Sequence, residues 1–86
     1  MYIVYILKSE EGKFYVGQTS NLDIRLRQHN EGLKGHTKKY TNWKIVHSEQ
    51  YSTRTEALER ERQIKKLKFG ETFRKHFDTG EANNAG

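Results

Sequence analysis

The chain has 86 residues, no cysteine and no proline, and a formal net charge of +5 at neutral pH. A chain of this length forms one small domain that buries only about 60–65% of its unfolded surface. The lack of cysteine excludes disulfides and metal sites built on thiolates, and it is compatible with a reducing, cytoplasmic-type compartment.

The first predicted element is a strand over residues 2–7, in which both alternating sets of side chains are apolar or aromatic. Such a strand is normally central in its sheet, with other elements covering each face. Lys8 ends the apolar run, which is too short to span a membrane and lacks the basic start of a signal peptide. A turn with a glycine follows, so residues 14–18 should return as an antiparallel strand. Gly17 weakens that strand, and we expect another backbone or a ligand to approach it closely.

Two helices are predicted from capping boxes at their starts and glycines after their ends. The capping box of the first helix covers residues 20–23 and opens at Ser20, and Gly32 follows the end of that helix. The second opens at residues 53–56 and runs to about Lys68, with Gly70 as its stop.

The first of these helices carries two pairs of residues that are four positions apart. Leu22 and Leu26 form an apolar face, and Arg25 and His29 lie at the border of that face. The helix therefore presents an arginine and a histidine beside its packed side.

The remaining segments complete a small α+β domain. Residues 33–42 show no periodicity and are interpreted as a mobile basic loop, and residues 43–48 alternate as a third strand. A short third helix or turn should cover one end of the core, because three phenylalanines follow at intervals of four: Phe69, Phe73 and Phe77. The domain is expected over residues 1–77, with a disordered tail over residues 78–86. The order β-β-α-β-α-(α) predicts a largely antiparallel sheet with helices against its faces.

Positive charge is concentrated in two segments. Residues 25–44 hold six Lys or Arg against one acid, a net charge of +5. Residues 54–75 hold eight against four, a net charge of +4, and the other residues sum to −4. This distribution suits a polyanionic partner, although solvated helix faces would explain it about as well.

Glu61 interrupts the apolar stripe of the second helix. It lies four residues after Ala57 and three before Ile64, both of which belong to that stripe. An isolated buried carboxylate costs several kcal/mol unless it is paired or bound to a cation. Two interpretations stay open: a structural ion pair with an arginine such as Arg25, or a metal ligand or acid–base group.

No other common catalytic pattern is present. The four histidines lack zinc spacing, and there is no glycine-rich phosphate loop and no Ser-His-Asp order. The residues alone thus predict a basic α+β domain in which tyrosines, an arginine and a carboxylate converge.

Those same residues resemble the GIY-YIG nuclease family over about residues 2–77. Ile3-Val4-Tyr5 stands where the family has Gly-Ile-Tyr, and Tyr15-Val16-Gly17 stands where it has Tyr-Ile-Gly, ten residues on. Arg25, in Arg25-Leu26-Arg27-Gln28-His29, matches the catalytic arginine, and Glu61 matches the metal-binding glutamate. The chain is most similar to the small stand-alone branch, and it also resembles the N-terminal domain of the excinuclease C subunit.

The resemblance implies a three-stranded antiparallel sheet flanked by helices and hydrolysis of DNA phosphodiesters with one Mg²⁺ or Mn²⁺. Glu61 would hold the metal, and Arg25 would bind the scissile phosphate. Tyr5 or Tyr15 would orient or deprotonate the attacking water, with His29 as the alternative base.

DNA contacts are expected from six further residues: Arg27, Lys34, Lys38, Lys39, Tyr40 and Lys65. A partner protein is an alternative source of targeting. Two other functions fit the same residues: a basic DNA-binding module with little or no nuclease activity, and a domain that recruits another protein. Binding alone does not require a glutamate on the core stripe, which favours the nuclease.

Overall fold

The chain folds around a three-stranded antiparallel sheet in the order β2-β1-β3. The computed structural model describes residues 1–32, 40 and 42–78. Strand β1 (Tyr2–Lys8) is central and pairs with β2 (Phe14–Thr19) and with β3 (Lys44–Tyr51). The predicted central position of the first strand and its hairpin with the second are therefore confirmed.

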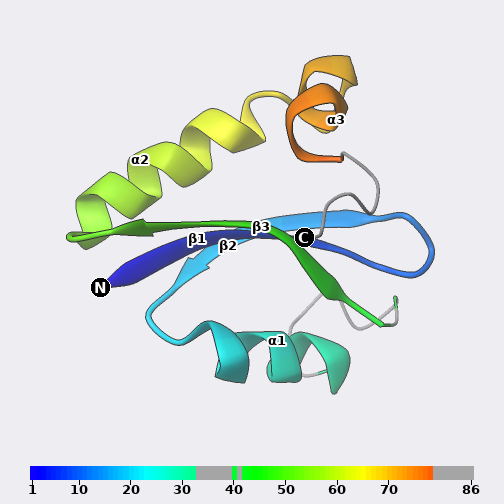
Figure 1. The fold of residues 1–86 in the computed structure, drawn as a ribbon, viewed down its shortest axis with the longest axis horizontal. Helices are drawn as coiled ribbons and strands as arrows, with labels where there is room; N and C mark the ends of the chain where they lie inside the picture. Colours follow the sequence, from blue (N-terminus) through cyan, green and yellow to red (C-terminus); the bar gives the residue numbers. More distant parts are fainter. Residues whose placement is uncertain (33–39, 41, 79–86) are drawn as a thin grey trace.

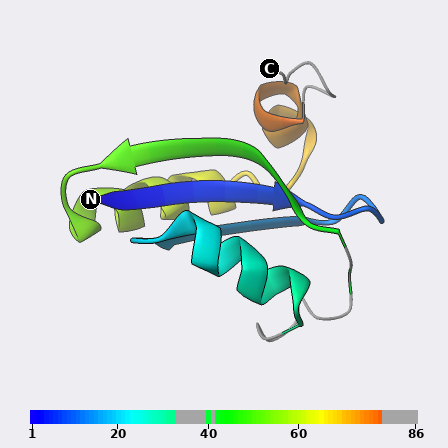
Figure 2. The same cartoon turned by 60° about the horizontal axis from the view of Figure 1, so that its bottom comes forward.

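Helices cover both faces of this sheet. Helix α1 (Leu22–Asn30) lies on one face, and α2 (Arg54–Lys65) and α3 (Glu71–Phe77) lie on the other (Figure 1). The view turned by 60° shows α1 in front of the sheet and α2 behind it (Figure 2). The molecule is thus an α+β fold of three layers, in the predicted order of elements.

The two faces of β1 pack into two separate hydrophobic clusters. On the α2 and α3 face, Val4 and Ile6 belong to a cluster with Ile64 and Phe73. On the α1 face, Tyr5 and Leu7 belong to a cluster with Trp43, against which Leu22 and Leu26 pack. Alternation along one strand therefore supplies both cores, as its two apolar sets predicted.

The helix boundaries differ from the prediction in detail. The N-cap of α1 is Asn21, not Ser20, because the Asn21 side chain accepts a hydrogen bond from the backbone N–H of Ile24. Gly32 has the expected left-handed backbone, with φ of 75°. The capping box of Thr53 and Glu56 at the start of α2 is confirmed.

Helix α2 ends at Lys65, three residues earlier than predicted. The left-handed positions that follow it are Lys68 and Phe69, with φ of 53° and 56°. Gly70 has φ of −83° and is the N-cap of α3. Gly70 therefore starts the next helix, and two non-glycine residues make the turn in its place.

Strand β3 and the end of α3 reach further along the chain than predicted. Strand β3 continues to Tyr51, past the expected end at residue 48. Asp78, expected in the tail, is the C-cap of α3 and pairs with Lys8 at 2.9 Å. Residues 79–86 of the expected tail, and residues 33–39 and 41 of the expected loop, lie outside the described residues. Within the described part of the chain, no helix has the length and apolar character needed to cross a membrane.

Candidate active site

A buried hydrogen bond joins strand β1 to helix α1. The hydroxyl oxygen of Tyr5 lies 3.1 Å from Nε2 of His29, and neither residue has exposed surface. His29 is in the last turn of α1, where the helix crosses the face of the sheet that carries Tyr5. The fold therefore brings together two of the predicted site residues from distant parts of the sequence.

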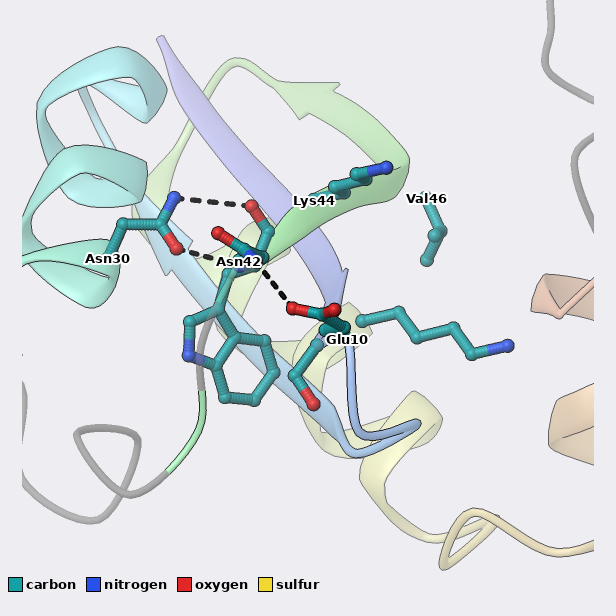
Figure 3. Close-up of a pocket in the computed structure, with 8 residues that line it drawn as sticks. Glu10, Asn30, Asn42, Lys44 and Val46 are labelled. Carbon is teal, nitrogen blue, oxygen red and sulfur yellow. Dashed lines mark hydrogen bonds between the residues drawn. The ribbon is translucent and has the colours of Figure 1, made fainter.

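The end of α1 is held in place by an asparagine that sequence reasoning missed. The Asn30 amide donates to the backbone carbonyl of Trp43 at 3.2 Å, and its Oδ1 accepts from the backbone N–H of Trp43 at 2.7 Å (Figure 3). Beside this pair, the Asn42 amide donates to the Glu10 carboxylate. The bidentate contact fixes the helix turn that carries His29, and no sequence spacing could reveal it because it joins a side chain to a distant backbone.

Gly17 is required because the Tyr5 ring lies across it. The two residues are paired in the register of β1 and β2, and a Cβ at Gly17 would lie only 2.8 Å from the Tyr5 hydroxyl oxygen. The expected close approach at Gly17 is therefore confirmed, but the Tyr5 side chain makes it instead of another backbone. The absent side chain lets the Tyr5 phenol extend over the edge strand β2.

Tyr15 completes a cluster of three rings. Its ring centroid lies 4.5 Å from that of His29 and 6.1 Å from that of Tyr5. Tyr15 is half-buried, whereas the other two rings are fully buried. Tyr15 is therefore the member of this cluster that reaches solvent.

The electrostatics of Tyr5 link the rings to the two charged site residues. Burial raises the pKa of Tyr5 well above its ordinary value of 10, and Tyr15 raises it further. Arg25 opposes this shift by its charge and by a hydrogen bond to Tyr5, while the Glu61 charge adds to it. Tyr5 consequently keeps its proton at neutral pH. Arg25 comes from α1 and Glu61 from α2, so groups from opposite faces of the sheet act on one phenol.

Glu61 is a partly shielded carboxylate whose side chain is 16% exposed. It pairs with Lys65 at 2.7 Å, one turn further along α2, and so the ion-pair partner is Lys65 and not the arginine considered from the sequence. Across the described residues, no cluster of three or more His, Cys, Asp or Glu could hold a metal ion. A single accessible carboxylate still fits Mg²⁺, a hard ion that keeps several waters and binds through one or two carboxylates.

The expected DNA-contact residues fall into three groups. Arg27 is exposed on α1, and Lys65 is half-exposed beside Glu61. Tyr40 packs edge-on against Trp43, with ring centroids 6.1 Å apart, and the Lys13 ammonium lies 6.0 Å from the Tyr40 centroid. Lys34, Lys38 and Lys39 lie outside the described residues.

A second polar cluster, which sequence reasoning also missed, joins β3 to α2. Arg60 donates from Nε and Nη2 to the two carboxylate oxygens of Glu49, at 2.8 and 3.0 Å. The Tyr51 hydroxyl donates to the same carboxylate, and His47 Nε2 lies 2.6 Å from it. These hydrogen bonds, led by that of Arg60, lower the pKa of Glu49 to about 2. The cluster lies on β3, the edge strand on the other side of β1 from β2, and it fastens α2 to that strand.

Comparison with known proteins gives matches along most of the chain. The sequence model of the GIY-YIG catalytic domain matches residues 1–72. A UPF0213 protein from Syntrophus aciditrophicus is 41% identical over 66 residues, which cover 74% of this chain and 76% of that protein. A UPF0213 protein from Staphylococcus aureus strain Mu3 is 37% identical over 68 residues, which cover 74% and 79%. The solution NMR structure of the UPF0213 protein BH0048 from Bacillus halodurans is 29% identical, with a TM-score of 0.49 and coverage of 78% of this chain and 73% of that one.

Proposed function

The chain belongs to the GIY-YIG family, and from this premise we propose that it is a metal-dependent endonuclease that hydrolyses DNA phosphodiester bonds. The observation that carries the proposal is the convergence on Tyr5. His29 contacts the Tyr5 hydroxyl, and Tyr15, Arg25 and Glu61 all act on its pKa. Strongly perturbed ionisable groups with specific charged neighbours are typical of functional sites.

Burial divides the five predicted catalytic residues into a group that can contact a substrate and a group that cannot. Arg25 and Tyr15 are half-buried and Glu61 is partly exposed, so these three can contact a substrate. The planar fork of Arg25 suits two oxygens of the scissile phosphate. Tyr5 and His29 have no exposed surface and lie behind them. The reaction joins a water oxygen to phosphorus and breaks one P–O ester bond, which leaves one phosphate end and one hydroxyl end.

Glu61 is the residue that would hold the metal, which when bound supplies positive charge to polarise the phosphate and to neutralise the leaving oxygen. The Lys65 ammonium already compensates the Glu61 carboxylate at 2.7 Å. A cation would take the place of that ammonium, and Lys65 would become free to contact the DNA backbone.

The proton of the attacking water needs an acceptor, and burial separates the three candidates. Tyr5 keeps its own proton, because its pKa lies well above the ordinary range. Its role is then to hold His29 through their hydrogen bond. His29 is an intrinsically better proton acceptor than a phenol near pH 7, but its ring is as fully buried as that of Tyr5 and does not meet the attacking water. We therefore assign Tyr15, the ring that reaches solvent, to orient the attacking water, whose proton leaves to the surrounding solvent, and His29 and Tyr5 to support that ring from behind.

The test is an assay of the purified protein on end-labelled single-stranded, duplex and branched DNA, with Mg²⁺, with Mn²⁺ or with EDTA. We expect cleavage that requires metal, and losses of about 100-fold or more in Glu61→Gln and Arg25→Ala. Glu59→Gln, an exposed change on the same helix, is the matched control and should cleave as wild type does. If wild type cleaves none of the substrates, or if Glu61→Gln matches it, the assignment is wrong.

The alternative functions predict different outcomes in the same samples. A binding module without nuclease activity would bind DNA with a steep loss of affinity between 50 and 200 mM salt, yet leave it intact. A domain that only recruits protein would show neither cleavage nor salt-dependent DNA binding.

A further inference from the structure

Two hollows adjoin the candidate active site on the side of β2. Phe14, Tyr15 and Phe69 line both of them. Among the described residues that complete their walls, the charged ones are cations: Lys13 and Arg74 in one hollow, and Lys65 and Lys68 in the other. None of the described residues that line either hollow is acidic. This surface therefore offers aromatic rings flanked by positive charge.

Phe69 is an exposed ring with a rigid base. Its ring stacks on Phe14, with centroids 5.9 Å apart and planes inclined by 16°, and it meets Phe73 edge-on at 4.9 Å. Phe73 is fully buried, yet Phe69 is 39% exposed. The core thus supports one side of the Phe69 ring, and part of the ring stays open to solvent.

The backbone is strained to hold this ring. Lys68 and Phe69 both have left-handed φ values, which cost roughly 1–2 kcal/mol per residue in side chains other than glycine. Gly70 follows immediately but has an ordinary φ of −83°. Strained non-glycine residues cluster at ligand sites, where the surrounding structure over-determines them. Here the strain coincides with the exposed ring.

We propose that Phe69 is a stacking platform for an unpaired nucleobase of the DNA strand, so that the substrate carries unpaired bases next to the scissile phosphate. This inference rests on the proposed nuclease function. Single strands bind in positively charged grooves in which bases stack on aromatic side chains. Bases inside a duplex already stack on one another, so their faces cannot reach the Phe69 ring.

The position of the hollows relative to the site supports this substrate. Tyr15, which reaches solvent from the ring cluster, lines both hollows. Lys65, the ion-pair partner of Glu61, lines the second. A strand whose phosphate lies between Arg25 and Glu61 would therefore place a neighbouring base beside Phe69. The cations around the two hollows suit the flanking phosphates.

The test measures binding separately from cleavage. Fluorescence anisotropy in EDTA compares a labelled 20-nucleotide single strand with the blunt duplex of the same sequence. The variant Phe69→Asn removes the ring while keeping a residue that tolerates left-handed φ, so the turn is preserved. Phe69→Trp keeps a stacking surface. Ile45→Ala on β3 is the matched control, because Ile45 is also 39% exposed and lies on the opposite edge strand.

We expect wild type to prefer the single strand, and Phe69→Asn to bind it about 5- to 100-fold more weakly with little change on the duplex. Phe69→Trp and Ile45→Ala should bind as wild type does. Equal effects of Phe69→Asn on both DNAs, or none on either, would overturn the inference. Binding is measured in EDTA, so it does not depend on cleavage. If the protein prefers the single strand in this way but cleaves no DNA when metal is supplied, the proposed nuclease function is wrong and the stacking site is still supported.

Discussion

The Tyr5 hydroxyl and His29 Nε2 lie 3.1 Å apart and link the central strand to the last turn of α1. Both side chains are fully buried, so this hydrogen bond belongs to the core as much as to the candidate site. A buried polar pair stabilises a fold only while both partners are present.

Changing Tyr5 to phenylalanine should therefore lower both stability and activity. Loss of the hydroxyl removes a hydrogen-bond partner from buried His29, at a cost of about 1–2 kcal/mol in the free energy of unfolding. Urea denaturation measures this change, and the DNA cleavage assay should show a clear loss of rate. Tyr2→Phe, on the same strand but half-buried, is the control. A Tyr5→Phe protein that cleaves at the wild-type rate would exclude Tyr5 from the site.

Gly17→Ala should displace the Tyr5 ring. The added Cβ would lie 2.8 Å from the hydroxyl oxygen and 3.0 Å from Cζ of Tyr5, within a packed region. Overpacking of this kind costs about 1–3 kcal/mol, measurable as a lower urea midpoint. The double variant with Tyr5→Phe, which lacks the nearest clashing atom, should recover part of that loss. If the double variant instead loses as much stability as the two single variants do together, the clash with the Tyr5 hydroxyl is not what destabilises Gly17→Ala.

Lys65→Ala should reduce the metal concentration that half-maximal cleavage requires. The Lys65 ammonium, 2.7 Å from the Glu61 carboxylate, competes with a bound cation for the same oxygens. Half-exposed pairs contribute about 0.2–1 kcal/mol, so we expect a shift of a few fold. Titration of Mg²⁺ in the cleavage assay measures it, with Lys66→Ala, an exposed neighbour, as the control. An increased metal requirement in Lys65→Ala would contradict the competition.

Glu49 should make stability depend on pH in the acid range. Its pKa falls from 4.5 to about 2 in the folded protein, so its contribution is fully present above about pH 4.5 and is lost as the pH falls toward 2. Because the carboxylate retains some exposure, we expect Glu49→Gln to cost about 1–2 kcal/mol at pH 7.

The difference in urea midpoint between wild type and Glu49→Gln should shrink between pH 4.5 and pH 2. Glu59→Gln, on exposed α2 surface, should follow wild type throughout. A difference that stays constant down to pH 2 would mean that the Arg60 contacts do not hold the carboxylate ionised.

The sequence predicted the order of elements and both packed faces of β1, because alternation and helical spacing are local signals. It also singled out Glu61 as a carboxylate on an apolar stripe, and the structure shows that side chain only 16% exposed; its role as a metal ligand stays a prediction. The ends of elements were harder to predict. Ser20 and Asn21 are both good N-caps, and only the observed bond to Ile24 decides between them. The end of α2 was misjudged because the left-handed turn uses Lys68 and Phe69 instead of the glycine beside them.

The contacts that sequence reasoning missed depend on tertiary packing. The Asn30 clamp and the Glu49–Arg60 pair join elements whose relative placement no spacing reveals. A partial signal existed for the second: His47, Glu49 and Tyr51 alternate along β3, so a polar set faces one side of an edge strand. The ion-pair partner of Glu61 was also open from the sequence, although Lys65 stands at the favourable spacing of four.

The double use of Tyr5 bears on how the chemistry of this fold could be lost during evolution. A descendant that no longer cleaved DNA would still need the phenol, because the core and the glycine beneath it are built around that ring. Arg25 and Glu61 are partly exposed, so they could drift at much lower cost to folding. In a related chain, a retained tyrosine is therefore weak evidence of nuclease activity, whereas a retained arginine and glutamate are stronger evidence.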